Sequence, residues 1–249
     1  MFGIINFAHS DPFYLALNDR YSFMRYGPRD ILSKILSGVL DGGMVSLVSY
    51  LQHTDQLTLM ESATISSKSA TISTILVSRE EDLRDNIHIA VTAHTETTVF
   101  YAKEVLKKMG IRAEFHVSDK TYAEELLEEE EYALVIGDEA LKAYRPGIRV
   151  LLDIGHEFSK LFHMPPVYAV TVCSKGADCK DYANTISRAI KKYRSLVKPT
   201  IDLTAFRLSL NPAVVEAYFN TIDYTFDISK KRTIEFVSSK INEMPSRSA

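Results

Sequence analysis

The feature that most constrains the fold is a regular alternation of short apolar segments with helical segments. Apolar runs at 87–92, 112–117, 132–136 and 149–154 are interleaved with stretches of helical character at 98–109, 122–130 and 156–162. Strands that alternate with helices along the chain are typical of sheets covered by helices. The sequence therefore predicts an α/β fold.

The rest of the chain continues this pattern on both sides of the middle segment. Further strands are predicted at 3–8, 44–48, 72–78 and 167–173, and further helices at 13–17, 29–40, 49–53, 180–197, 211–220 and 230–241. The middle segment suffices for a compact unit, whereas the first 80 residues do not easily form a full sheet alone. We therefore expect one lobe from 1–86 plus 169–249, a second from 87–168, and a cleft between them.

A predicted strand at 132–136 ends in Gly137 and Asp138, which directs attention to the carboxyl end of that strand. Ligands of open α/β sheets bind at the carboxyl ends of the strands. Gly137 lets the backbone approach a ligand closely, and Asp138 would stand at the mouth of the cleft. The alternative interpretation is that Asp138 only caps a helix beginning at Glu139.

Hydroxyl side chains gather at the ends of predicted strands. They are Ser46, Ser66, Ser67, Ser69, Ser73, Thr95, Thr97 and Thr98. The segment from Thr95 to Thr98 enters a helix, and the N–H groups and dipole of a helix N-terminus attract carboxylates or phosphates. Glu96 must then point away or be paired. Simple helix capping is the alternative, and the sequence leaves both open.

His9 follows the first predicted strand and lies at a sharp bend. A histidine in that place is suited to acid or base chemistry near neutral pH, or it holds the turn by hydrogen bonding. His94 occupies a similar loop. The chain has no zinc-protease, Walker, nucleophile-elbow or dinucleotide-binding motif, so we expect neither a metal nor a cofactor.

Charge and hydrophobicity limit the classes of partner that we expect for this protein. The net charge of −3 gives no reason to expect nucleic acid or a membrane surface as partner, and no apolar run reaches the length of a membrane span. The N-terminus reads as a strand and not as a signal peptide. We therefore expect a cytoplasmic protein whose two cysteines, Cys173 and Cys179, are normally reduced.

Several segments, taken in order, resemble the chorismate dehydratases of the futalosine route to menaquinone. They are Ile5 to Tyr14, Gly38 to Asp41, Val45 to Tyr50, Ile136 to Leu141, Asp153 to Gly155, Pro166 to Val170 and Tyr218 to Tyr224. The resemblance implies a type II periplasmic-binding-protein-like fold, with two α/β lobes that close on a small carboxylate substrate. It also implies a cytoplasmic lyase that removes water from chorismate to give 3-enolpyruvylbenzoate without a cofactor.

The resemblance also suggests roles for individual residues. His9 stands where the family typically has an asparagine that is thought to contribute to catalysis, and Ser73 matches a family serine. We expect these two in catalysis. The residues expected to bind substrate are Ser46, Ser66, Ser69, Thr95, Thr97, Thr98 and Asp138.

The chain departs from the family pattern at several positions. The segment from Lys68 to Ala70 replaces an Asp-Gly-Pro loop, Phe158 replaces a tryptophan, and Met164 replaces a glycine. Two other functions are therefore kept as alternatives. One is the related cyclase of the same pathway, and the other is a non-catalytic binding protein for a small aromatic or dicarboxylate ligand.

Overall fold

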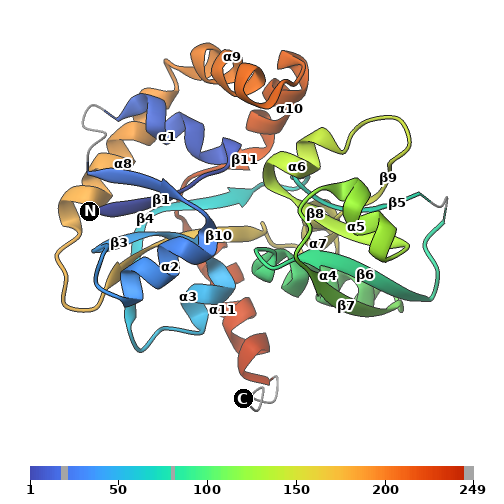
Figure 1. Cartoon of the computed structure of the whole chain (residues 1–249). Helices are drawn as coiled ribbons and strands as arrows, with labels where there is room; N and C mark the ends of the chain where they lie inside the picture. Colours follow the sequence, from blue (N-terminus) through green and yellow to red (C-terminus); the bar gives the residue numbers. More distant parts are fainter. Residues whose placement is uncertain (18–21, 80–81, 244–249) are drawn as a thin grey trace.

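The computed structural model describes residues 1–17, 22–79 and 82–243. Within these ranges the chain forms two α/β lobes that lie side by side (Figure 1). Each lobe is built on its own sheet, one of six strands and one of five. The two separate sheets agree with the expectation of two lobes, and the α/β class is confirmed.

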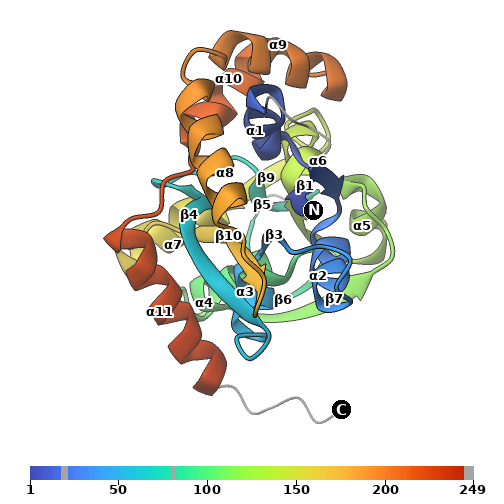
Figure 2. The ribbon, with the colours of Figure 1, turned by 90° about the vertical axis from the view of Figure 1, so that its left-hand side faces the viewer.

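Lobe 1 contains the six-stranded sheet, in the order β11-β4-β10-β3-β1-β2. Its strands are β1 (Phe2–Ile5), β2 (Phe23–Tyr26), β3 (Gly42–Ser46), β4 (Leu57–Ser67), β10 (Val167–Ser174) and β11 (Ile222–Asp223). Its helices are η1 (Ala8–Ser10), α1 (Asp11–Ala16), α2 (Pro28–Leu36), α3 (Leu47–Leu51), α8 (Lys180–Tyr193), α9 (Val197–Leu208), α10 (Pro212–Thr221) and α11 (Ile228–Glu243). Figure 2 shows α8, α9 and α10 gathered with α1 at one end of this lobe, and α11 extending from the other.

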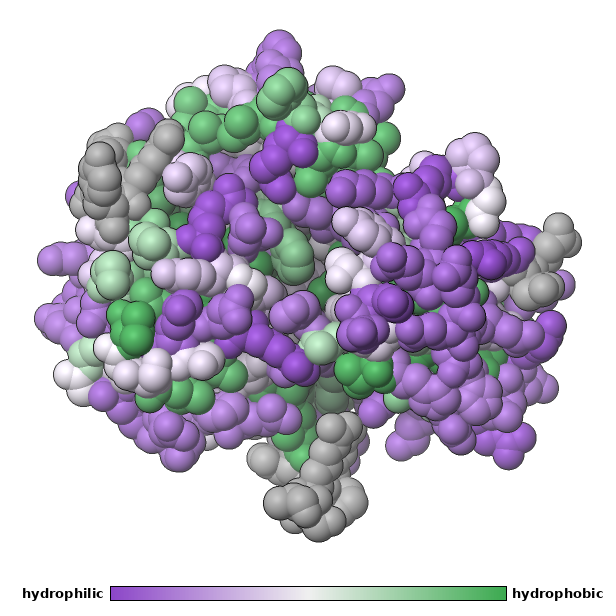
Figure 3. Space-filling model, in the orientation of Figure 1, coloured by the Kyte–Doolittle hydropathy of each residue, from purple (hydrophilic) through white to green (hydrophobic). Residues whose placement is uncertain are grey.

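Lobe 2 contains the five-stranded sheet, in the order β7-β6-β8-β5-β9. Its strands are β5 (Thr74–Ser78), β6 (Asn86–Thr92), β7 (Arg112–Ser118), β8 (Tyr132–Ile136) and β9 (Arg149–Asp153). Its helices are α4 (Glu96–Lys108), α5 (Ala123–Glu129), α6 (Gly137–Lys142) and α7 (Ile154–Phe162). The face of this lobe seen in Figure 3 is largely hydrophilic, whereas hydrophobic residues gather on lobe 1 around α9 and α10.

The chain crosses between the lobes twice. It leaves lobe 1 after Ser67 and enters the sheet of lobe 2 at Thr74, and it returns between Phe162 and Val167. The expected first boundary at residue 86 is therefore wrong, because β5 lies in lobe 2. There β5 lies between β8 and β9 and pairs antiparallel with both. The order of elements along the chain does not reveal this position.

The cores explain why these segments form strands and helices. Strand β8 is buried at four of its five positions, as its apolar run predicts, and its neighbour β6 alternates exposed and buried residues at its first four positions. On α7 the buried Phe158 packs against Tyr101 of α4, with ring centroids 4.3 Å apart. Aromatic pairs at such separations stabilise a core beyond the area that they bury.

Two segments of the structure differ from the sequence predictions. The long strand β4 covers 57–67, where no strand was predicted. The hydroxyls of Thr64 and Ser66 donate to backbone carbonyls, and Thr171 of the neighbouring β10 donates to the carbonyl of Ala63, so this polar strand is compatible with burial. The predicted helix at 180–197 ends at Tyr193 as α8, and a separate helix, α9, covers 197–208, where no helix was expected.

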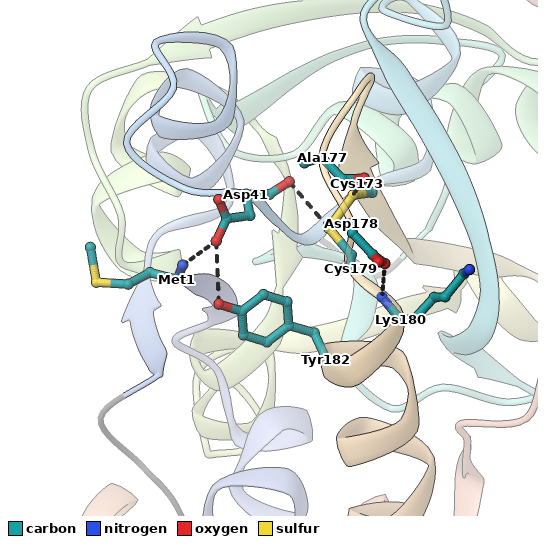
Figure 4. The surroundings of a disulfide bond; sticks show 8 residues. All are labelled: Met1, Asp41, Cys173, Ala177, Asp178, Cys179, Lys180 and Tyr182. Atoms are coloured by element: carbon teal, nitrogen blue, oxygen red, sulfur yellow. Dashed lines mark hydrogen bonds and ion pairs between the residues drawn. A yellow bond between two sulfur atoms is a disulfide. The ribbon is translucent and has the colours of Figure 1, made fainter.

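The two cysteines are not free thiols in the structure. Cys173, in β10, and Cys179, just before α8, form a disulfide (Figure 4), so the expectation of reduced thiols is wrong for this structure. Nearby, Asp41 contacts the N-terminal amine and accepts a 3.2 Å hydrogen bond from the Tyr182 hydroxyl. Within the described residues, no helix has the length and apolar character needed to span a membrane.

Candidate functional site

A pocket lies between the two lobes, with walls from both. About 590 Å³ of space unoccupied by protein atoms lies there, a figure that includes solvent at the open side of the pocket. Its lining residues are Ile5, Phe7, His9, Pro28, Ser46, Ile65, Thr71, Ser73, Thr74, His94, Thr95, Thr97, Thr98, Ile136, Gly137, Tyr168, Ala169, Tyr218 and Ile222. The pocket therefore has an apolar body with hydroxyl and imidazole groups set into it.

Strand ends position much of this lining, as expected for α/β folds. His9 follows β1, Ser46 ends β3, and Thr95 lies in the loop after β6. Gly137 follows β8 directly. Because these strands belong to two different sheets, the pocket depends on how the lobes meet.

His9 is buried, with 8% of its surface exposed, and its Nε2 has no hydrogen-bond partner among the described residues. Its backbone carbonyl accepts a 2.9 Å hydrogen bond from Tyr224, which fixes the turn. Burial lowers the pKa of the His9 imidazole to about 3, and the charges of Arg25 and Arg207 add to this against the opposing effect of Asp11. His9 is therefore a neutral imidazole at physiological pH.

The first crossing between the lobes forms one wall of the pocket. The carboxylate of Asp153 accepts hydrogen bonds from the backbone N–H groups of Thr71 and Ile72, at 2.9 and 2.8 Å. These bonds hold Ile72 at a φ of 64°, a left-handed conformation that is unusual for a β-branched residue. Strained backbone of this kind persists where the surroundings fix it, often beside ligand sites.

Tyr168 of β10 closes the same wall. Its hydroxyl lies 2.6 Å from Thr71 Oγ1 and 3.3 Å from Thr74 Oγ1, and burial raises the pKa of Tyr168 well above its ordinary value. A Cβ at Gly155 would lie 1.8 Å from Thr71 Oγ1 and 2.3 Å from the Tyr168 hydroxyl. Only glycine fits at this position near the start of α7. Gly155 therefore leaves room for the hydroxyls of Thr71, Thr74 and Tyr168 to lie together.

Ser73 and Gly137 join the crossing to β8. The carbonyl of Ser73 accepts a 2.8 Å hydrogen bond from the N–H of Gly137. A hydrogen bond from Ser73 moderates the pKa of Tyr218, which burial nevertheless raises far above its ordinary value. Gly137 has a φ of 61°, and a Cβ there would lie 3.2 Å from the ring of Phe7 in lobe 1. Gly137 thus permits close contact between the lobes.

The hydroxyls at the start of α4 face lobe 1. Thr97 accepts a 3.2 Å hydrogen bond from the backbone N–H of Val48, and Thr95 bonds to Thr92 over 2.8 Å. Glu96 is paired, as an anion site at this helix start requires: it accepts hydrogen bonds from Ser46, over 3.1 Å, and from Ser49. Arg29 adds an ion pair to Glu96 at 3.5 Å.

Asp138 makes a second contact between the lobes. Its Oδ1 accepts a 2.7 Å hydrogen bond from the N–H of Ala8, and its Oδ2 lies 2.9 Å from Arg207 Nη1. Arg207 also contacts the fully buried Asp11, at 3.0 Å. The helix α6 begins at Gly137 with Ile136 as its N-cap, so Asp138 does not cap the helix.

The structure brings together most, but not all, of the predicted site residues. The pocket lining includes His9, Ser46, Ser73, Thr95, Thr97 and Thr98. Ser66 is instead buried in β4, where its hydroxyl donates to the Asp223 carbonyl, and Ser69 is exposed on the crossing. These two serines and Asp138 lie outside the pocket lining, so the structure does not bring them together with the other predicted site residues.

Sequence reasoning missed several residues of the lining. Thr71, Thr74, Tyr168 and Tyr218 come from segments that meet only after the chain has crossed twice. Tyr168 lies within an apolar run, and Tyr218 within a helix, where a tyrosine ordinarily signals packing. Their adjacency to Ser73 and Thr71 depends on tertiary structure.

The chemistry available in the pocket is that of neutral groups. Among the described lining residues there is no lysine, arginine, aspartate or glutamate. An anion bound there would be held by hydroxyls, by N–H groups and by the N-terminal end of α4. The low polarity of the walls strengthens each of these interactions.

Comparisons with known proteins agree with this architecture. A curated relative, the chorismate dehydratase of Thermus thermophilus, is 22% identical over 240 residues, which cover 89% of this chain and 88% of the relative. A crystal structure of a protein from Archaeoglobus fulgidus aligns over 97% of both chains, with a TM-score of 0.73 and 12% identity.

Binding proteins share the same fold. The alkanesulfonate-binding protein SsuA from Xanthomonas axonopodis pv. citri, solved bound to MOPS, aligns with a TM-score of 0.70 and 16% identity, over 97% of this chain and 90% of that one. The aliphatic sulphonate-binding protein SsuA from Escherichia coli aligns with a TM-score of 0.67 and 13% identity, over 97% of this chain and 86% of that one. The two-lobed fold is thus that of periplasmic binding proteins, as expected.

The family of the chain follows from a match along nearly its whole length. The model of a protein family described as menaquinone biosynthesis covers residues 1–243. That range includes both lobes, both crossings and every residue of the pocket lining. The chain is therefore a member of the menaquinone biosynthesis family.

Proposed function

We propose that this protein is a hydro-lyase that removes water from chorismate to give 3-enolpyruvylbenzoate. Membership of the menaquinone biosynthesis family and the likeness to a chorismate dehydratase support this reaction. The observation that carries the proposal is the pocket between the lobes, where a neutral imidazole and several hydroxyls line a largely apolar space. The proposal places the reaction in the cytoplasm, as for the family that the chain resembles.

The reaction needs little chemical driving force from the protein. A ring C–H bond and the bond from the ring to the hydroxyl oxygen both break, the proton and the hydroxyl leave as water, and the ring becomes aromatic. The protein must hold both carboxylates of the substrate, exclude bulk water and assist the transfer of the proton.

The N-terminal end of α4 is well suited to one substrate carboxylate. Thr97 and Thr98 of its first turn line the pocket, and the positive end of the helix dipole lies there. Glu96 of the same turn would repel an anion, but its charge is taken up by Arg29 and by the hydroxyls of Ser46 and Ser49. The helix start can therefore receive a carboxylate.

His9 is better suited to hydrogen bonding than to taking a proton. An imidazole whose pKa is about 3 is a weak base at neutral pH, but a neutral ring still offers one donor and one acceptor. In this proposal His9 bonds to the departing oxygen, as the asparagine typical of the resembled family also could. The substrate's own enolpyruvyl carboxylate then remains available as the base.

The direct test is incubation of the purified protein with chorismate. The expected result is the growth of aromatic absorbance together with a product lighter than chorismate by one water in mass spectrometry. A catalytically silent protein that still binds chorismate in calorimetry would contradict the lyase and support a binding function. The likeness to sulfonate-binding proteins is the observation that favours this second candidate.

The related cyclase of the same pathway is distinguished by substrate. If chorismate is neither bound nor converted, the proposed reaction fails, and extracts enriched in later intermediates of the pathway become the appropriate substrates. Ser73→Ala serves as a probe of the same pocket in each assay, because Ser73 lines it and is 5% exposed. A change in activity of this variant would show that the pocket is the site used.

A further inference from the structure

Three side chains that bind metals well meet on the outer edge of lobe 2, away from the pocket. His88 lies in β6, and Glu114 and His116 lie in the edge strand β7. Because β6 and β7 are parallel, with His88 opposite Glu114 and Ala90 opposite His116, the three residues share one face of the sheet. Their ligand atoms all lie within 4.8 Å of one another.

The individual distances are close to those of a metal site. His88 Nδ1 and His116 Nε2 lie 3.7 and 3.9 Å from the same oxygen of Glu114. In a tetrahedral site with bonds of about 2.0–2.2 Å, ligand atoms are separated by about 3.4 Å. Rotations of exposed side chains cover that difference, because about half of each histidine side chain is accessible.

A second carboxylate gives an independent indication of metal binding. His116 Nδ1 contacts the carboxylate of Glu130, which follows α5, while its Nε2 faces Glu114 and His88. Histidines that bind metals almost always donate their other ring N–H to a carboxylate or carbonyl, which fixes the tautomer and the ring. Glu130 thus keeps the Nε2 lone pair of His116 directed at the centre of the cluster.

We propose that His88, Glu114 and His116 form a site for a divalent transition metal, of which zinc fits the ligands best. Two imidazoles and one carboxylate are a ligand set that zinc prefers, and they leave one tetrahedral position for water or an external group. Magnesium and calcium prefer sites made of oxygen atoms and are not expected to compete. The site lies outside the proposed reaction and does not depend on it.

The position of the site gives the metal a structural consequence. Strand β7 is at the edge of its sheet and pairs only with β6 among the described strands. A metal held by His88 on one strand and by Glu114 and His116 on the other adds a cross-strand link at this edge. Zinc should therefore raise the melting temperature of the protein while leaving turnover of its substrate unchanged.

The test is calorimetric titration of the untagged, full-length protein with zinc chloride. We expect one zinc per chain, loss of this binding in His88→Ala and His116→Ala, and affinity about tenfold to a hundredfold lower in Glu130→Gln, the usual cost of removing such a supporting carboxylate. Far-UV circular dichroism checks that each variant is folded, which is expected because these side chains are exposed.

His156→Ala is the matched control. It removes an exposed histidine that lies in α7 and is not part of the cluster. Its zinc affinity should equal that of the wild type. The proposal is overturned if the wild type takes up no zinc, or if its binding survives in both His88→Ala and His116→Ala. In that case the cluster is a group of surface ion pairs only.

Discussion

Asp138 accepts a 2.7 Å hydrogen bond from the backbone N–H of Ala8, and this bond joins lobe 2 to the turn after the first strand of lobe 1. The same carboxylate pairs with Arg207 of α9 at 2.9 Å. One side chain thus links two elements of lobe 1 beside the turn that carries His9. We therefore infer that Asp138 helps to hold the lobes together around a ligand.

Asp138→Ala should weaken ligand binding. Hydrogen bonds to charged groups contribute about 1.5–3 kcal/mol each, so the loss corresponds to roughly a tenfold or greater rise in KM or Kd for chorismate. The matched control is Asp202→Ala, which breaks an exposed Lys198–Asp202 pair on the same helix as Arg207. Unchanged affinity in Asp138→Ala would show that the contact does not help the lobes to close.

Substitutions of His9 should separate hydrogen bonding from proton transfer. If His9 donates to the departing oxygen, His9→Ala should lower kcat about 10²–10³-fold, the usual cost of removing one such donor. His9→Asn keeps a donor and should retain much more activity than the alanine variant. Steady-state kinetics with chorismate measure both effects, and equal loss in the two variants would instead assign proton transfer to the imidazole.

Stability should depend on pH through His9. Burial lowers its pKa from 6.5 to about 3, so the unfolded chain takes up a proton below about pH 6.5 that the folded chain does not. The contribution of neutral His9 is therefore complete above pH 6.5 and is lost as the pH falls towards 3. In that window the free energy of unfolding should fall by up to about 1.4 kcal/mol per pH unit on account of this residue.

Urea unfolding of wild type and His9→Asn between pH 7 and pH 4 measures this contribution directly. The variant lacks the titrating group, so its free energy of unfolding should fall less steeply with decreasing pH. Other groups titrate equally in both proteins and cancel in the comparison. If the free energy of unfolding fell with pH at the same slope in both proteins, the pKa of His9 in the folded protein would lie near its ordinary value.

Some parts of this fold follow from sequence because local pattern and final environment agree. The apolar run of β8 is buried, and the segments from 87 to 162 all formed the expected elements. In β4 the local sequence pattern and the final environment of the residues disagree. Its end, from Thr64 to Ser67, is polar and was not predicted as a strand, but the hydroxyls of Thr64 and Ser66 donate to carbonyls of residues 225 and 223, which only the folded chain brings near. Periodicity carries no information about such partners.

Gly155→Ala should damage both stability and the pocket. The added Cβ would meet Thr71 Oγ1 at 1.8 Å and the hydroxyl of Tyr168 at 2.3 Å, and overpacking of this kind typically costs about 1–3 kcal/mol. Urea unfolding gives the loss. Combination with Thr71→Ala, which removes the nearest clashing atom, should recover part of it; a wild-type stability in Gly155→Ala alone would contradict the close packing described above.

Replacement of both cysteines by serine should leave the pocket intact. Cys173 is four residues beyond Ala169 of the lining along β10, a distance of about 13 Å for a strand. The disulfide closes only a short loop, so its loss should lower the melting temperature modestly while KM and kcat stay at wild-type values. A large fall in kcat would show that the loop acts on the site at a distance.

The site itself was harder to anticipate than the fold. Hydroxyls at strand ends were recognised because strand ends are where such folds bind ligands, and Thr95, Thr97 and Thr98 indeed line the pocket. Thr71 and Tyr168 were not, since they are 97 residues apart in sequence and meet across a crossing. The cluster of His88, Glu114 and His116 was missed for the same reason: His88 and Glu114 are neighbours only through the pairing of β6 with β7.

Both crossings between the lobes run close to the pocket, and this has a mechanical consequence. Thr71 and Ser73 of the first crossing line the pocket, and so does Tyr168, the second residue of β10, which follows the second crossing. A rotation of one lobe about these two crossings leaves the nearby walls almost in place while it carries remote elements, such as α8 and α5, through much longer arcs. Labels on those two helices would therefore act as the ends of a lever that magnifies small rearrangements around a bound molecule.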